Sequence, residues 1–201
     1  MWENKNHCKF SPHSSTFYYF IHSMIMINVW EAFMSQYTST SGTILQIQWQ
    51  NSAPAQSGCG LMLTLQTMDQ GIVNIHVDGS TYIPDNHPLK TGEQITCFYS
   101  LLAPVPLIYP PQYHGVVVVP TPVGTYAALD TFTRLPSGNQ LTNSDDTLRL
   151  NISNTTKKTL PNGQPFGGVL SGKMLLVIYT ATTRSIPAQT SPERIIVFCG
   201  A

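Results

Sequence analysis

The chain contains two versions of one segment, and this internal repeat constrains its fold more than any other feature. The first version is Tyr99–Val119, YSLLAPVPLIYPPQYHGVVVV, and the second is Tyr179–Phe198, YTATTRSIPAQTSPERIIVF. Each begins with a tyrosine that ends an apolar run, continues through a loop with a Pro-Xaa-Gln step, and finishes in a β-branched run. A repeat of this kind predicts two copies of one folding unit.

The residues just upstream extend the repeat. Thr91–Ser100, TGEQITCFYS, and Ser171–Thr180, SGKMLLVIYT, align without a gap. Pro120-Thr121-Pro122 follows the first version, and clustered prolines of this kind punctuate a chain. We therefore expect a first β lobe over residues 34–119 and a second over residues 120–201, each close to the smallest size at which a domain folds alone.

Alternation of apolar and polar residues predicts strands. In Ile44–Gln50, the residues Leu45, Ile47 and Trp49 share one face and glutamines occupy the other, as in a half-buried strand. The expected strands are 44–50, 61–65, 72–78, 93–100 and 115–119 in the first lobe, and 126–134, 139–143, 147–153, 173–180 and 193–198 in the second. Five strands with a non-strand connection between the third and fourth are typical of an OB fold, a small Greek-key barrel. We predict an all-β protein of two tandem, pseudo-symmetric OB-like five-stranded barrels; the alternative is a single β-sandwich built from the two repeats.

The charged residues are few and balanced. They make up 10% of the chain, with 10 Lys and Arg against 10 Asp and Glu. A protein that binds the nucleic-acid backbone normally carries a basic face, so this composition disfavours nucleic acid as a partner. A net charge of zero also gives little protection against self-association. The expected partner is therefore a second copy of the chain, in a homo-oligomer, or another protein.

Residues 1–33 differ in character from the rest. Their apolar run, Phe17–Phe33, is broken by polar and charged residues, which makes a poor membrane span, and it lacks the small-residue cleavage pattern of a signal peptide. The codons for Trp30-Glu31-Ala32 can contain a ribosome-binding sequence just ahead of the Met34 codon. We therefore expect translation to begin at Met34 in a bacterium, so that residues 1–33 are a non-native leader or a mis-assigned start. A cytoplasmic location without membrane contact follows from that start.

The four cysteines are Cys8, Cys59, Cys97 and Cys199, and none forms a CxxC pair. A sequence-local zinc site is therefore not expected. Cys97 lies inside an apolar strand run and Cys199 follows one. We expect buried or half-buried free thiols, and a Cys97–Cys199 disulfide is the alternative in an oxidising compartment.

No catalytic constellation is recognisable in the sequence. His76, His87 and His114 are the candidates for a metal site, but no carboxylate spacing supports them, and we interpret them as solvated histidines. Several aspartates stand in turn sequences and are interpreted as turn formers: Asp69, Asp78, Asp85, Asp145 and Asp146. Both the G-x-S-x-G nucleophile motif and the G-x-G-x-x-G phosphate loop are missing. The sequence predicts a protein that is not an enzyme and needs no cofactor or metal.

The aromatic and proline-rich loop from Tyr99 to Tyr113 has the composition of a binding surface. The candidate binding residues are Tyr99, Tyr109, Pro110, Pro111, Gln112 and Tyr113 in the first version and Arg184 and Gln189 in the second. Such a loop suits a proline-rich or extended peptide, or the stacking of bases or sugars. In the alternative interpretation, the prolines stiffen a crossover and the tyrosines pack the rim of the barrel.

We predict a non-enzymatic β binding or assembly module whose ligand the sequence does not identify. The alternative is an OB-type protein that binds single-stranded nucleic acid, with tyrosines at positions 82, 99, 109 and 113 stacked on bases. That alternative lacks a basic track, since Lys90 is the only Lys or Arg in the first lobe. Gln112 and Gln189 are expected to occupy equivalent places and to bond main chain that prolines leave without a donor.

A motif in this loop also resembles one in known proteins. FYSLLAPVPLIYPPQY, at Phe98–Tyr113, is similar to an APVPLIYPPQY motif of small two-repeat β proteins from Gram-positive, clostridial-type bacteria. TTRSIPAQT, at Thr182–Thr190, is similar to their second-half counterpart. The resemblance covers roughly residues 41–198. It implies the two-lobe organisation and the start at Met34, and because that family has no established activity it implies no catalytic residue.

Overall fold

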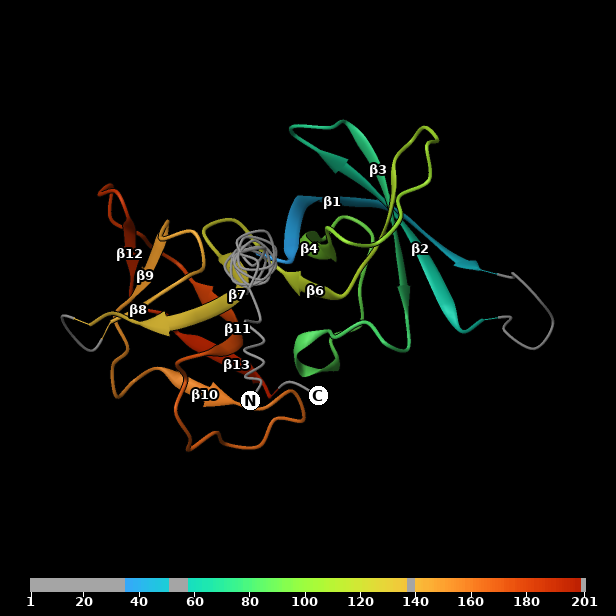
Figure 1. The fold of residues 1–201 in the computed structure, drawn as a ribbon. Helices are drawn as coiled ribbons and strands as arrows, with labels where there is room; N and C mark the ends of the chain where they lie inside the picture. The colour runs from blue at the N-terminus through green and yellow to red at the C-terminus, as the bar shows by residue number, and fades with distance from the viewer. Residues whose placement is uncertain (1–34, 51–57, 137–139, 200–201) are drawn as a thin grey trace, which may run out of the picture. The chain divides into compact units, whose positions relative to one another are not determined.

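The first half of the chain folds into a six-stranded sheet with the strand order β5-β3-β2-β1-β4-β6. A computed structural model describes residues 35–50, 58–136 and 140–199 (Figure 1). The strands of the first sheet are β1 (Tyr37–Gln50), β2 (Gly60–Thr67), β3 (Ile72–Asp78), β4 (Gln94–Ser100), β5 (Gln112–His114) and β6 (Val117–Pro120). A 3₁₀ turn, Pro84–Asn86, lies in the connection between β3 and β4.

The pairing closes the first sheet on itself. β1, β2 and β3 form an antiparallel meander, and β4 pairs with the other edge of β1. β5 pairs with β3 in parallel, whereas β6 pairs with β4 in antiparallel fashion. The two short strands thus act as one interrupted fifth strand that joins β3 to β4.

The interruption occurs at Gly115. A Cβ atom on this residue would lie 3.2 Å from Cys97 Sγ and 3.2 Å from Ile75 Cγ2. Glycine suits this close approach to the core, because a Cβ here would press on both side chains. The predicted strand 115–119 is therefore wrong at its start, because the chain bends there and β6 begins at Val117.

The second half repeats the same pairing in a seven-stranded sheet, with the order β10-β13-β11-β7-β8-β9-β12. Its strands are β7 (Tyr126–Arg134), β8 (Leu141–Thr142), β9 (Leu148–Leu150), β10 (Lys157–Thr159), β11 (Lys173–Tyr179), β12 (Ala188–Thr190) and β13 (Arg194–Phe198). β12 pairs with β9 in parallel and β13 pairs with β11 in antiparallel fashion, as β5 and β6 do in the first sheet. In the first sheet, an isolated parallel bridge between Tyr82 and Val117 corresponds to the parallel pairing of β10 with β13 in the second.

The prediction of an all-β chain with two barrel-like sheets is confirmed, but the strand count is not. The fifth strand is broken in both sheets and the second sheet gains β10, so the sheets have six and seven strands. β8 and β9 are also shorter than predicted. Asn143 Oδ1 accepts hydrogen bonds from the main-chain N–H of Thr147 (3.0 Å) and of Leu148 (2.8 Å), which turns the chain between them.

The inward face of β1 also differs from the prediction. Ile44 is fully buried, whereas Leu45 is exposed and Trp49 is 66% exposed. A register shift in the pairing with β2 lies between Ile44 and Gln46. A bulge at this point moves the following side chains to the opposite face, so Ile47 contacts the core with Ile44, whereas Leu45 does not.

Each sheet encloses its own apolar core, and the aligned segments supply equivalent core residues. Ile95 and Cys97 of β4 lie in the first core, and Leu175 and Val177 of β11 lie in the second. These are the residues that the gap-free alignment of the two halves places opposite each other. Aligned residues of the two halves therefore also face inward in the same way.

A third buried cluster is shared by the two sheets. It consists of Phe98, Val117 and Val119 from the first sheet and Leu129, Leu176 and Ile196 from the second. β4, β6, β11 and β13 are consequently covered on both faces, which explains why their sequences are continuous apolar runs instead of alternating ones. Arg194 adds a polar link, because its guanidinium donates to both carboxylate oxygens of Asp85, at 2.6 and 2.8 Å.

In the part of the chain that the structure describes, no helix combines the length and the apolar composition needed to cross a membrane. The predicted leader, residues 1–33, and the predicted start at Met34 lie outside the described residues.

Candidate functional site

The loop Leu101–Pro111 connects β4 to β5 and carries a concentration of exposed apolar side chains. Leu102 is 80% exposed and Tyr109 is 82% exposed. The exposed apolar residues of this loop are Leu101, Leu102, Val105, Leu107, Ile108 and Tyr109. The loop contains no charged residue, so its surface is apolar along most of its length.

Two of the candidate binding tyrosines, Tyr99 and Tyr113, lie at the base of this loop. The rings of Tyr99 and Tyr113 are stacked, with centroids 4.1 Å apart and planes inclined by 12°. The Tyr113 hydroxyl donates a hydrogen bond to Gln70 Oε1 at 3.1 Å, and burial raises the pKa of the Tyr99 hydroxyl to about 12. These two tyrosines pack the barrel rim, and Tyr109 stands apart from them in the exposed loop.

The two Pro-Xaa-Gln steps occupy equivalent places in the two sheets. Gln112 opens β5 opposite Asn74, and Gln189 lies in β12 opposite Arg149. Pro110 and Pro187, which begin the steps, both follow cis peptide bonds.

The predicted hydrogen bonds of the two glutamines are not found. Gln189 Oε1 accepts from the side chains of Gln140 (3.2 Å) and Asn151 (3.3 Å) instead of from main chain. Among the described residues, the Gln112 side chain has no hydrogen bond. The main chain beside the prolines has another hydrogen-bond partner. The Pro111 carbonyl accepts a hydrogen bond from the Asn74 N–H at 2.9 Å. Strand pairing thus satisfies the main chain without the glutamine side chains.

The second loop is less apolar than the first. Arg184 is exposed there, and Ile186 is its exposed large apolar side chain. The loop is fastened internally, since the main-chain N–H of Gln189 donates to Thr183 Oγ1 at 2.9 Å. Of the two equivalent loops, only the first presents an extended apolar surface.

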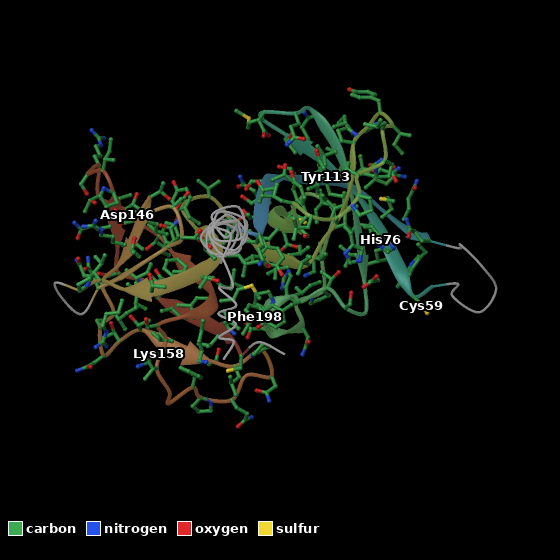
Figure 2. The ribbon with its side chains drawn as sticks, in the orientation of Figure 1. Cys59, His76, Tyr113, Asp146, Lys158 and Phe198 are labelled. Atoms are coloured by element: carbon green, nitrogen blue, oxygen red, sulfur yellow. The ribbon has the colours of Figure 1, made fainter. Side chains whose placement is uncertain are left out.

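A second candidate site, which the sequence interpretation missed, combines His76, Asp78 and His114. Their ligand atoms lie within 4.8 Å of one another, and His76 is labelled in Figure 2. His87 is elsewhere, with its Nε2 2.7 Å from Glu93 Oε1. All three histidines keep side-chain exposures of 30–43%, so their interpretation as solvated is not contradicted. That interpretation overlooked the carboxylates of Asp78 and Glu93, which lie beside them. The missing information was the parallel pairing of β3 with β5, which local sequence patterns do not reveal.

Asp78 is held firmly in this cluster. Its Oδ1 accepts from the Ser80 hydroxyl at 2.7 Å and from the Ser80 N–H at 2.8 Å, and its Oδ2 lies 3.0 Å from His114 Nε2. The bond from the Ser80 hydroxyl and the contact with His114 hold the pKa of this carboxyl well below its usual range. Asp78 is thus both the predicted turn former and a fixed negative charge beside two histidines.

The cysteines that the structure describes are free. Cys97 is fully buried, and burial raises the pKa of its thiol to about 12, which makes it a poor nucleophile. Cys59 and Cys199 are exposed, so the interpretation of Cys199 as buried or half-buried is wrong. The alternative disulfide between Cys97 and Cys199 is not formed.

The described residues define the class of the protein as all-β, with two barrel-like sheets. No protein-family model matches the chain, and no curated protein is significantly similar to it. The resemblance to the clostridial-type proteins therefore stays a prediction, and the candidate sites depend on their geometry alone.

Proposed function

We propose that the protein is a non-enzymatic binding or assembly module of two OB-like barrels, with the loop Leu101–Pro111 as its contact element. The observation that carries this proposal is the concentration of exposed apolar side chains in that loop. Single apolar side chains are normal on a protein surface, whereas contiguous apolar patches are typical of interaction sites.

The OB-like assignment is supported by the strand pairing. In each sheet the first three strands form a meander, and the interrupted fifth strand lies between the third and the fourth. This is the arrangement of a five-stranded Greek-key barrel, in which the loop between the fourth and fifth strands contributes to ligand binding. Leu101–Pro111 is the loop in that position.

The chemistry of the loop favours another copy of the chain as its partner. Apolar side chains are stabilised by contact with an apolar surface, and a net charge of zero opposes such contact only weakly. Binding of single-stranded nucleic acid has less support. Tyr99 and Tyr113 already stack on each other, and Lys90 is the only cation of the first lobe. A cytoplasmic location, as expected from the sequence, remains part of the proposal.

Sedimentation velocity over a range of protein concentrations tests the proposal. The variant is Leu102→Glu with Leu107→Glu, which places two charges in the loop without touching either core. The matched control is Val169→Glu, since Val169 is 68% exposed but lies outside the loop. We expect the wild type and the control to associate as concentration rises and the loop variant to stay monomeric. A monomeric wild type at high concentration, or a loop variant that associates equally well, would refute the proposal.

A further inference from the structure

The two histidines of the second candidate site are brought together by strand register. β3 and β5 pair in parallel with His76 opposite His114, so their side chains leave the same face of the sheet. The ring centroids are 5.2 Å apart and the planes are inclined by 44°. Asp78 follows His76 by two residues along β3, which places its carboxylate on that face as well.

We propose that His76, Asp78 and His114 form a binding site for a divalent transition-metal ion. Asp78 Oδ2 lies 3.0 Å from His114 Nε2 and 3.9 Å from His76 Nδ1. In a tetrahedral zinc site with bonds of about 2.0–2.2 Å, ligand atoms are separated by about 3.4 Å. The two distances lie on either side of this value, and all three ligand atoms lie within 4.8 Å of one another, so side-chain rotation toward a common point would let them bind an ion.

A hydrogen-bonded His–Asp pair accounts for only part of this arrangement. It engages His114 and Asp78, but His76 Nδ1 lies 3.9 Å from the same carboxylate oxygen, beyond hydrogen-bond distance. A metal ion among the three ligand atoms would engage all of them. Two imidazoles and one carboxylate are the ligand set of many zinc and non-haem iron sites.

The surroundings orient these ligands. Ser80 occupies Oδ1 of Asp78 with two hydrogen bonds, which leaves Oδ2 directed at the histidines, as partners behind a metal ligand do. Gly60 makes room for the His76 ring, because a Cβ at residue 60 would lie 2.9 Å from His76 Nε2. The arrangement thus holds the carboxylate and leaves space for the ring.

The site opens into a pocket with a volume of about 430 Å³. His76 and Asp78 line this pocket, together with Gln50, Cys59 and Ser80. Three protein ligands leave a fourth position on a tetrahedral ion free for water, for a small ligand or for a further side chain. The exposed Cys59 thiol lines the same pocket but lies outside the group of three ligand atoms, so it must turn toward them to take that position.

Zinc binding to the full-length chain tests the site. Titration calorimetry with ZnCl₂ compares the wild type with His76→Ala and His114→Ala, and His87→Ala is the matched control because His87 bonds to Glu93 outside the cluster. We expect each cluster variant to weaken zinc binding at least about tenfold, the loss typical even of outer-shell partners, and the control to bind like the wild type. His114 is 43% exposed, so we expect its replacement to leave the fold intact, and thermal melting of the metal-free variants checks this.

The N-terminal segment also carries His7, Cys8, His13 and His22, so binding by the wild type is not sufficient support. The decisive observation is the change caused by His76→Ala and His114→Ala. Absorption spectra with Co²⁺ add a second measurement. A thiolate charge-transfer band that disappears in Cys59→Ser identifies Cys59 as the fourth ligand, and spectra without such a band indicate an open fourth position. Unchanged zinc affinity in both histidine variants overturns the proposal.

Discussion

Replacement of Leu176 by alanine tests whether the two sheets bury a common cluster. Leu176 is fully buried and belongs to the shared cluster, where it lies opposite Leu129 and Ile196 in the strand register. Leu175, its neighbour on β11, is equally buried but belongs to the core of the second sheet. The two leucines therefore make a matched pair on opposite faces of one strand.

The expected cost follows from the burial. A Leu→Ala change at a fully buried site lowers the free energy of unfolding by about 3–5 kcal/mol, the lost transfer energy plus the cavity. If the outer face of β11 met solvent, Leu176→Ala would cost only about 0.5 kcal/mol. We expect both variants to lose about 3–5 kcal/mol. At about 2–4 °C per kcal/mol for a domain of this size, the melting temperature falls by about 6–20 °C.

Urea unfolding, followed by tryptophan fluorescence and circular dichroism, measures both variants. A lower midpoint with an unchanged dependence on urea shows a loss of stability without a change in the unfolded state. Leu102→Ala is the control, because Leu102 is 80% exposed and its truncation should cost no more than about 0.5 kcal/mol. A loss below about 1 kcal/mol for Leu176→Ala, beside the full loss for Leu175→Ala, would refute the shared cluster.

Two further predictions concern single contacts. The hydrogen bonds from Arg194 lower the pKa of the Asp85 carboxyl, so the ion pair stabilises the fold above the unfolded-state pKa of about 3.9 and this contribution is lost as pH falls below it. Because exposed ion pairs contribute little, Asp85→Asn should lower the free energy of unfolding by up to about 1 kcal/mol at pH 7 and by nothing near pH 2. Urea unfolding at both pH values measures this loss, and an equal loss at both would contradict the assignment. Gly115→Ala should lower the free energy of unfolding by about 1–3 kcal/mol, because the added methyl group overpacks the core. Gly167→Ala, which has open space around it, should not. Equal melting temperatures for the two variants would contradict the close packing at Gly115.

The sequence predicted those features that depend on local pattern. The expected strand at residues 72–78 is confirmed as β3, and its alternate residues Val73, Ile75 and Val77 all face the core. The alignment of the two halves placed the β4 and β11 segments in register, and Ile95 and Leu175 occupy equivalent core positions. Pattern is sufficient here because one face of a strand repeats every two residues.

Features that depend on long-range pairing were not predictable in this way. The bulge after Ile44 reverses which of its neighbours face the core, and it is visible only in the pairing of β1 with β2. His114 joins His76 because a parallel pair forms between segments far apart in the sequence. The sequence His76-Val77-Asp78 places a histidine and an aspartate on the same face of a strand, which predicts part of that cluster. No local pattern indicates that His114 joins them.

The shared cluster has a consequence for the origin of the chain. The first sheet contributes β4 and β6 to it, and the second contributes β11 and β13, which have the equivalent pairing, together with Leu129 of β7. Contact between equivalent surfaces of two like units is the defining property of an isologous dimer. A single ancestral unit with this face would have exposed it to water unless it paired with a copy of itself. The two halves of this chain thus bury like surfaces against each other, as the two subunits of a homodimer do.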